Sequence, residues 1–520
     1  MKRVSARHKF PSVRYIKESL SFSRHAPSPS QGFSKEELHL SYSYVSTSSS
    51  SSCRILSVLF EVPNGTHWCK KMDRMSGLAD ETLNVIMGFN GAKEDARVLT
   101  LAKRFRNLHT IVGSLNFDDI NDFHGTFSEF VSERLGLLED NQFVRRFSLK
   151  ARAILDPADI AQWLRDVLKR GVVDVSLHIH GNNGAPLPLE LFNSSSVGML
   201  RLGRHLVISE VPATAALPAL ETLVLDSVRF HAFGDCAFQA FLSACPTLKD
   251  LTINGWFWET WRWGGMLSNN SLQRLTITRR MQGGFDGLDY QEISFQTPSL
   301  RYLDYTNFVP DAYTVVNLES LEEAKLYLQV VEDREWFGEL LEDPDRLSSN
   351  PTNLIEGIKN VKSLTLSSSS TFQTLYFFRE SIPLFENLHH LTMRHSDMRV
   401  CWRFLPFLLS KTPNLKTLHI EGGLHYAQKS ESLDYVCECV SEYSCLSSCA
   451  VEFMDINMWD DGAEGEMEQI KHFLGKLAHL ELLKVHSLGG ISDEEKLRIT
   501  NHLLMLPRAS PKCKVEISFR

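Results

Sequence analysis

The chain has 520 residues, of which 43% are hydrophobic and 23% charged, a composition typical of a globular protein with a large buried core. The formal net charge of −8 argues against nucleic-acid binding, which needs concentrated Lys and Arg, and no apolar run approaches the ~20 residues that span a bilayer. The ten cysteines are scattered along the chain, which favours reduced thiols in the cytoplasm or nucleus over a disulfide framework.

Residues 1–71 are rich in serine and basic residues. Up to residue 34 the only acidic residue is Glu18, and the segment contains the run "VSTSSSSSC" (45–53). Such a composition predicts a disordered extension that cannot bury a core. Two alternatives remain open: translation could start at Met72, or the segment could be an organelle transit peptide, since these are also rich in Arg and Ser and poor in acids.

The next segment, "DRMSGLADETLNVIMGFNGAKEDARVLTLAKRFRNL" (73–108), has a different character. Apolar residues recur in it at near-helical spacing: Leu78, Leu83, Ile86, Met87 and Phe89. This spacing predicts a small helical segment with one apolar face.

Beyond residue 140 one pattern returns repeatedly: apolar, two variable residues, apolar, one variable residue, apolar. The copies are "VRRFSL" (144–149), "VVDVSL" (172–177), "VGMLRL" (197–202), "LETLVL" (220–225), "LKDLTI" (248–253), "LQRLTI" (272–277), "LRYLDY" (300–305), "LEEAKL" (321–326), "VKSLTL" (361–366), "LHHLTM" (388–393), "LKTLHI" (415–420) and "LELLKV" (480–485). Most successive copies begin about 21 to 28 residues apart, within the range of leucine-rich repeats.

Each copy predicts a short strand with one apolar face. Its last three positions alternate between apolar and variable, so one face points into a core and the other outward. Since one such strand cannot bury its apolar face alone, stacked copies are expected to form one parallel sheet with a shared core. The sequence therefore predicts an α/β fold, a leucine-rich-repeat solenoid with helices or irregular crossovers on one side.

The outward strand positions are the candidate contacts for a partner. They include Asp250, Arg274, Tyr302, Asp304, His390 and His419. Their charges are mixed, with no stripe of one sign, which indicates a protein partner.

A further candidate is the aromatic connection "NGWFWETWRWGG" (254–265). Its relevant residues are Trp256, Trp258, Trp261, Arg262 and Trp263. Exposed Trp and Arg are typical of interface hot spots. The alternative is that the loop folds its aromatic rings over the end of the sheet, because Trp is often largely buried.

No motif indicates catalysis or a cofactor. The phosphate-binding, dinucleotide-binding, serine-hydrolase and zinc-protease templates are absent from the sequence. The spacing of Cys437, Cys439, Cys445 and Cys449 does not match a zinc site, so we expect neither a metal nor an enzyme.

Residues 73–108 resemble the F-box of plant proteins, which reads close to D-R-I-S-x-L-P-D-E-L-L. The segments "LPALETLVLDSVRF" (217–230) and "FLSACPTLKDLTI" (241–253) resemble parts of the plant F-box/LRR family that carries a C-terminal FBD domain. The final segment "LPRASPKCKVEISF" (506–519) resembles the closing FBD motif. The resemblance covers roughly residues 73–520.

This resemblance implies a domain order and partners. It implies a divergent F-box at 72–112, leucine-rich repeats at 140–430 and an FBD domain at 440–520 that caps the solenoid. It also implies a substrate-recognition subunit of an SCF-type cullin ubiquitin ligase, which binds a Skp-type adaptor and an unknown protein substrate. The implied adaptor contacts are Leu78, Ala79, Leu83, Ile86, Met87, Phe89 and Phe105.

The F-box segment departs from the family pattern at several positions. Ala79 replaces the usual Pro, Thr82 a usual Leu and Phe105 the usual Trp, while "NGAK" (90–93) replaces L-P-T-K. Losing the Pro removes a pre-set first helical turn. These departures leave open an alternative function, a non-catalytic repeat scaffold whose F-box no longer binds the adaptor.

Overall fold

The computed structural model describes the chain from residue 111 onward with gaps. The described ranges are 111–120, 125–139, 142–179, 187–203, 206–208, 210–230, 234–255, 265–279, 292–329, 349–395, 404–422, 444–458, 464–487 and 491–519. By its internal contacts the chain separates between Lys71 and Met72, and every described residue belongs to the part that begins at Met72.

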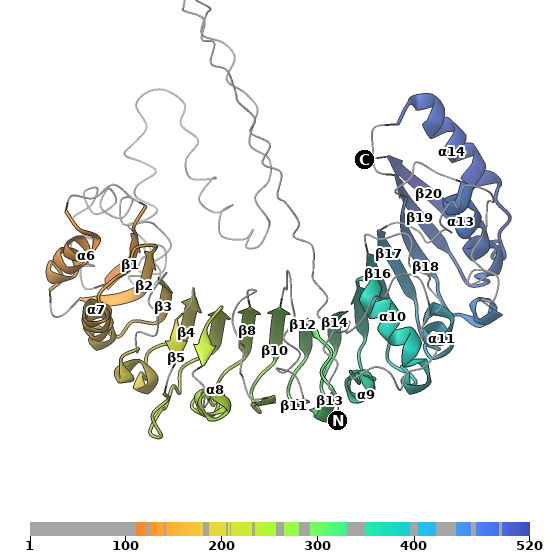
Figure 1. Ribbon diagram of the computed structural model, residues 1–520. Coiled ribbons are helices and arrows are strands. Elements are labelled where there is room, and N and C mark those ends of the chain that lie inside the picture. The colour runs from red at the N-terminus through yellow and green to blue at the C-terminus, as the bar shows by residue number, and fades with distance from the viewer. Residues whose placement is uncertain are drawn as a thin grey trace, which may run out of the picture. The chain divides into compact units, whose positions relative to one another are not determined.

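Among the described residues, fifteen strands form one sheet that is the framework of the protein, and every neighbouring pair in it is parallel (Figure 1). In spatial order its strands are β1 (Ile111–Asp118), β2 (Phe143–Ala151), β3 (Asp174–Ile179), β4 (Met199–Gly203), β6 (Thr222–Asp226), β8 (Asp250–Gly255), β10 (Arg274–Arg279), β12 (Tyr302–Phe308), β14 (Glu323–Gln329), β15 (Ser363–Ser367), β16 (His390–His395), β17 (Thr417–Gly422), β18 (Phe453–Met458), β19 (Leu482–Ser487) and β20 (Lys514–Phe519). The spatial order follows the chain order, as stacking of successive repeats requires.

The solenoid predicted from the repeated pattern is confirmed. Each of the twelve copies lies over one strand of this sheet, and β1, β18 and β20 complete it. Strand β12 shows the expected alternation, since Leu303 and Tyr305 are 0% exposed while Tyr302 and Asp304 are partly exposed. Parallel pairing places Leu251, Leu275 and Leu303 in one register, so the buried residues of neighbouring repeats form a continuous apolar row.

The crossovers between strands are of two kinds. Helices and 3-10 helices make up most of them: α6 (Phe127–Gly136), α7 (Pro157–Lys169), η2 (Leu189–Asn193), α8 (Gly234–Ser243), α9 (Thr352–Gly357), α10 (Ser369–Phe377), η4 (Arg379–Ser381), α11 (Phe404–Ser410), η5 (Ser444–Ser448), α13 (Glu464–Lys476) and α14 (Asp493–Met505). Short strands form two minor sheets, β13 (Ala312–Asn317), β11 (Glu292–Gln296) and β9 (Met266–Ser268) in one, β5 (Val207–Ile208) and β7 (Arg229–Phe230) in the other. Within the described part of the chain, no helix is long and apolar enough to span a membrane.

The helix starts follow local sequence signals. Helix α6 begins with a capping box, in which the Thr126 hydroxyl accepts from the Glu129 amide and the Glu129 carboxylate accepts from the Thr126 amide. Helix α7 is capped by Asp156 and has Pro157 in its first turn. These caps fix the residues at which α6 and α7 begin.

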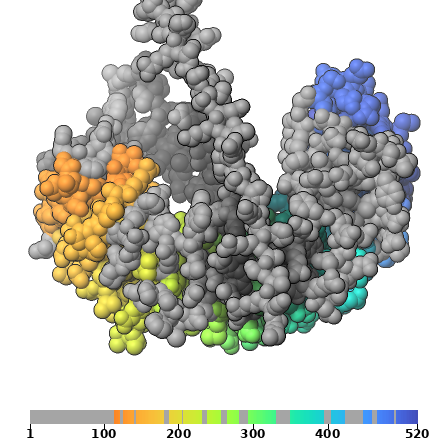
Figure 2. All heavy atoms as spheres, viewed as in Figure 1, coloured from red at the N-terminus to blue at the C-terminus, as the bar shows by residue number. Residues whose placement is uncertain are grey.

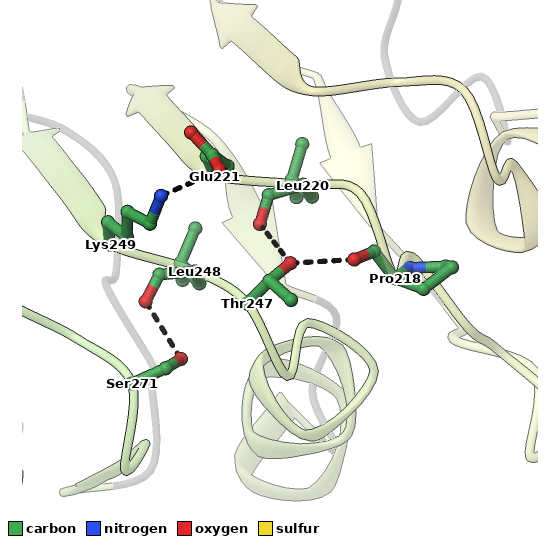
Figure 3. Close-up of polar contacts among 7 residues, drawn as sticks. All are labelled: Pro218, Leu220, Glu221, Thr247, Leu248, Lys249 and Ser271. Carbon is green, nitrogen blue, oxygen red and sulfur yellow. Dashed lines mark hydrogen bonds and ion pairs between the residues drawn. The ribbon is translucent and has the colours of Figure 1, made fainter.

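A polar side chain ties each of several repeats to the one before it. This residue immediately precedes the first apolar residue of the repeat, and we call it the lead residue. The lead residue Thr247 directs its hydroxyl toward the carbonyls of Pro218 and Leu220, at 2.8 and 3.2 Å (Figure 3). The lead residue Ser271 donates to the Leu248 carbonyl at 2.9 Å.

The same device recurs elsewhere in the solenoid. Ser196 donates to the Val172 carbonyl at 2.9 Å, and the Asn414 amide donates to the Glu386 carbonyl at 2.9 Å. Two residues after the lead residue Thr247, Lys249 forms an ion pair with Glu221 of the preceding repeat, at 2.7 Å (Figure 3). In the space-filling view, the described repeats follow one another in chain order, from the orange N-terminal repeats to the blue C-terminal ones (Figure 2).

The C-terminal segment continues the same architecture. Strands β18, β19 and β20 follow β17 in the one sheet, in unbroken parallel register. The cap inferred from the sequence is therefore built from the last strands of the solenoid itself, with α13 and α14 as its crossovers.

Candidate functional site

The main sheet has one face packed against the core and one that carries the variable side chains. We call the second the open face, defined by the residues that alternate with buried ones in β2 to β20. Most of its side chains in β6 to β19 are half-buried or exposed, although the apolar residues between them are buried. A protein partner can reach this face without disturbing the core.

Six side chains gather on the open face where β8, β10, β12 and β14 lie side by side. This central cluster consists of Asp250, Arg274, Tyr302, Asp304, Glu323 and Lys325. The Tyr302 ring lies between cations from both neighbouring strands, with the Arg274 guanidinium carbon 4.0 Å and the Lys325 ammonium 5.1 Å from the ring centroid. Cation–π contacts of this kind hold the ring in place.

Carboxylates surround these cations. Arg274 Nε lies 3.5 Å from Asp250 Oδ1, and Lys325 Nζ lies 3.3 Å from Glu323 Oε1. The Tyr302 hydroxyl donates to Asp304 Oδ2 at 3.4 Å. The cluster thus presents an aromatic ring framed by charges of both signs, a composition that favours a protein ligand.

Two groups of the cluster have shifted pKa values. Burial raises the pKa of the Asp304 carboxyl, and the nearby Lys325 ammonium offsets only part of that rise. Burial alone would lower the pKa of Lys325, but hydrogen bonding and charge attraction to Tyr302 and Glu323 raise it overall. Asp304 is therefore a carboxylate held where ionisation is disfavoured, a property that is common at functional sites.

A second group, the C-terminal cluster, lies on the open face across β17, β18, β19 and β20. Asp455 stands between two histidines, with His486 Nε2 3.0 Å from one carboxylate oxygen and His419 Nδ1 3.7 Å from the other. The other ring nitrogen of His486 shares a hydrogen bond with the Ser518 hydroxyl. Lys484 lies 5.6 Å from the centroid of the Phe453 ring.

At the other end of the sheet, Asp174 of β3 is only 7% exposed and faces two arginines. Arg146 Nε donates to its Oδ2 at 2.8 Å, and an Arg201 nitrogen lies 3.8 Å from its Oδ1. The two arginines lie on the strands flanking β3, so this cluster joins three repeats.

The structure brings some of the predicted contacts together and separates others. Asp250, Arg274, Tyr302 and Asp304 lie in the central cluster, and His419 lies in the C-terminal cluster. His390 is exposed on β16, in register with Ser363 and Thr417, and belongs to neither cluster.

The remaining predicted contacts lie outside the described residues. These are the adaptor-binding candidates Leu78, Ala79, Leu83, Ile86, Met87, Phe89 and Phe105, and the aromatic candidates Trp256, Trp258, Trp261, Arg262 and Trp263. In sequence, Trp256 directly follows β8, the strand that carries Asp250.

Sequence reasoning missed several members of these clusters, and four of them carried a signal: Glu323, Lys325, Asp455 and His486. Glu323 and Lys325 occupy variable positions in the recognised copy "LEEAKL". Asp455 lies in "VEFMDI" (451–456), which fits the repeat pattern but was not counted as a copy. His486 follows the copy "LELLKV" at the next outward position, beyond the end of the six-residue pattern.

Other features offer little chemistry. Among the described residues, no group of three or more His, Cys, Asp or Glu side chains is arranged to hold a metal ion. Cys245 is buried, and burial raises the pKa of its thiol to about 12, so it stays protonated. A shallow depression between β13 and α9, lined by residues such as Val315 and Gly357, opens to solvent on the helix side.

Comparison with known proteins places this arrangement in a family. Residues 160–303 match the family model described as "FBD-associated F-box protein At5g56370, LRR repeats". The chain is 44% identical over 453 residues to F-box/LRR-repeat protein At3g58980 of Arabidopsis thaliana, covering 86% of this chain and 74% of that protein. It is 43% identical to F-box/LRR-repeat protein At3g62440 and to putative F-box/LRR-repeat protein At3g58920 of the same plant, in each case covering 86% of this chain and all of the relative.

Proposed function

Because this chain belongs to the F-box/FBD/LRR family of plant proteins, we propose that it is the substrate-recognition subunit of an SCF-type cullin ubiquitin ligase. In this role residues 72–112 bind a Skp-type adaptor, and through it a cullin. The repeats at 140–430 bind a protein substrate, and residues 440–520 complete the solenoid as the FBD domain. We place the complex in the cytoplasm or nucleus.

The receptor itself forms and breaks no bonds. It binds a substrate on one side and the ligase on the other, which raises the effective concentration of substrate lysines near the ubiquitin donor. A rigid connection between the two binding sites suits this task. The continuous sheet and the lead-residue hydrogen bonds supply such rigidity within the repeats.

The central cluster is the observation that supports substrate binding on the open face. Tyr and Arg are enriched among interface hot spots. Tyr302 and Arg274 are held together before a partner arrives, so less side-chain entropy is lost on binding. The Asp304 carboxyl, whose pKa is raised by burial, offers a charge that a basic group on a substrate would stabilise.

Adaptor binding is tested by co-purification of the full chain with a plant Skp-type adaptor. We expect the wild-type chain to retain the adaptor, and a Leu78→Asp, Ile86→Asp variant to lose it because both substitutions charge the predicted apolar face. The matched control is Asn84→Asp, which adds one charge at a polar position of the same segment.

Either of two results would count against the ligase role. The wild-type chain could fail to retain the adaptor although circular dichroism shows it folded, or the doubly charged variant could retain it as well as the wild type. The first result would favour the second candidate function, a repeat scaffold without adaptor binding. That candidate is supported by the departures at Ala79, Thr82 and Phe105.

A further inference from the structure

The open face carries a second aromatic ring besides Tyr302. Phe453 of β18 alternates with the buried Met454 and is itself partly exposed. It lies in register with Leu482 of β19, which is also partly exposed. Because both residues alternate with core residues, the two apolar side chains lie on the face away from the core. Apolar surface left in water is unfavourable, and a partner that covers this pair would remove that cost.

Two basic side chains from the flanking strands frame the Phe453 ring. The His419 ring of β17 lies 5.5 Å from it between centroids, and the Lys484 ammonium of β19 lies 5.6 Å from its centroid. The central cluster has the same composition, an aromatic ring between basic side chains of both neighbouring strands. Aromatic and basic residues held together in this way are typical of interface hot spots.

The charge of Lys484 is only weakly compensated. Its ion pair with Glu516 is long, 3.9 Å, and 39% and 60% of the two side chains are exposed. An exposed pair of this kind contributes little, so it does not hold the ammonium in place. Lys484 can therefore attract an acidic group of a partner, directly beside the apolar pair.

Phe453 and Tyr302 occupy the same row of the open face. Parallel register connects them through one polar residue of each intervening strand: Glu323, Ser363, His390 and Thr417. At about 4.8 Å per strand, the five steps separate the two rings by about 24 Å along the sheet. An interface of ordinary size covers about 800 Å² on each partner, a patch roughly 28 Å across. One folded protein can therefore contact both rings.

From these observations we propose that the Phe453–Leu482 pair is a second anchor for the protein substrate, with the central cluster as the first. This inference rests on the proposed function, since it takes the open face as the substrate-binding face. The occupant is one folded protein that covers the apolar pair and places an acidic group next to Lys484, because both anchors lie in one row of one continuous sheet. The C-terminal segment then recognises the substrate in addition to completing the solenoid.

Photo-crosslinking of the full chain tests this proposal. The photoreactive amino acid p-benzoylphenylalanine replaces Tyr302, Phe453 or, as the control, Phe407 of α11, which is 40% exposed on the helix side. Each chain is irradiated in the same plant extract, and the attached proteins are identified by mass spectrometry. We expect positions 302 and 453 to crosslink to the same protein, and position 407 not to reach it.

The protein shared by both positions then serves as the probe for a binding measurement. Phe453→Ala should weaken its equilibrium binding to the full chain by about tenfold or more, as for an interface anchor, whereas Phe407→Ala should leave it unchanged. Lys484→Glu should weaken binding more at low than at high salt concentration, because salt screens the repulsion of an acidic group. Thermal unfolding of each variant checks that the fold is retained.

The crosslinking results distinguish a failure of this proposal from a failure of the proposed function. If the two positions crosslink to different proteins, or only position 302 crosslinks to any, the open face binds a substrate without this second anchor and the proposal is wrong. If neither position reaches a protein that position 407 does not, the open face is not the substrate-binding face and both fail. Binding that Phe453→Ala leaves unchanged would also overturn the second anchor.

Discussion

The two faces of the main sheet differ in a way that separates folding from recognition. On the covered face the residues are apolar in nearly every repeat, and Leu251, Leu275 and Leu303 form one buried row. On the open face the residues in register with one another change from Asp250 to Arg274 to Tyr302. One alternation in sequence thus stabilises the solenoid on one side and leaves the other free to vary with the partner.

The largest expected difference between the faces is in stability. Leu303→Ala should lower the free energy of unfolding by about 3 kcal/mol, because it leaves a cavity at a fully buried position. Thr306→Ala, on the open face of the same strand, should change it by less than about 0.5 kcal/mol. Denaturant unfolding of both variants measures the two values, and similar losses would contradict the division between the faces.

Contacts between repeats should have an intermediate effect. Thr247→Val removes the hydroxyl that points at the Pro218 and Leu220 carbonyls, and we expect a loss of about 1 kcal/mol. The control is Thr252→Val on the open face of β8, which makes the same chemical change without removing a contact between repeats. Equal unfolding midpoints for the two variants would show that the lead residue contributes nothing.

The contact between Arg274 and Tyr302 should contribute less. A double-mutant cycle with Arg274→Ala and Tyr302→Ala is expected to give a coupling free energy of about 0.5–1 kcal/mol, as for a partly exposed cation–π pair. Unfolding of the two single variants and the double variant supplies the value. Strictly additive losses would mean that the two side chains do not hold each other.

Asp304 should have the smallest effect, and in the opposite direction. Its pKa in the folded chain is raised by burial, so the protonated form favours folding and that contribution is lost as the pH rises through the folded-state pKa. Asp304→Asn lacks this loss. Because the side chain is partly exposed, the variant should at pH 7 be as stable as the wild type, or more stable by less than about 0.5 kcal/mol.

Comparing unfolding at about pH 3 and pH 7 checks the sign for Asp304. From about pH 3 to about pH 7, the free energy of unfolding of the wild type should fall slightly relative to that of Asp304→Asn. A variant clearly less stable than the wild type at pH 7 would show that the ionised carboxylate stabilises the fold instead.

The fold could be predicted because the repeated pattern specifies both where the strands lie and which of their faces is buried. The position of Leu303 or Leu251 within a copy specifies which face it occupies, and stacking follows from the need to bury that face. The crossovers were harder, since β9, β11 and β13 are short and lack a repeated motif. Residues such as Leu267, Phe295 and Tyr313 are buried there by contacts that no local pattern encodes.

The clusters on the open face were predictable only in part. The outward positions followed from the alternation, which is how Arg274, Tyr302 and Asp304 were identified. Which of them meet depends on side-chain reach across strands, as in the approach of Lys325 to Tyr302. His419 and Asp455 lie on the paired strands β17 and β18, with 35 residues of chain between them. Sequence spacing does not show that these two strands are neighbours.

The central claim is that the open face selects the partner, and one comparison tests it most directly. Proteins retained by the full wild-type chain from a plant extract are compared with those retained by Arg274→Ala, Tyr302→Ala and by Arg379→Ala, Tyr376→Ala. The second pair is a matched control, because Arg379 lies 4.8 Å from the Tyr376 ring centroid, next to α10 on the helix side.

We expect the open-face variant to lose a set of proteins that the helix-side control keeps, while all three chains retain the adaptor equally. If the open-face variant retains every protein that the wild type does, the open face is not where the substrate binds.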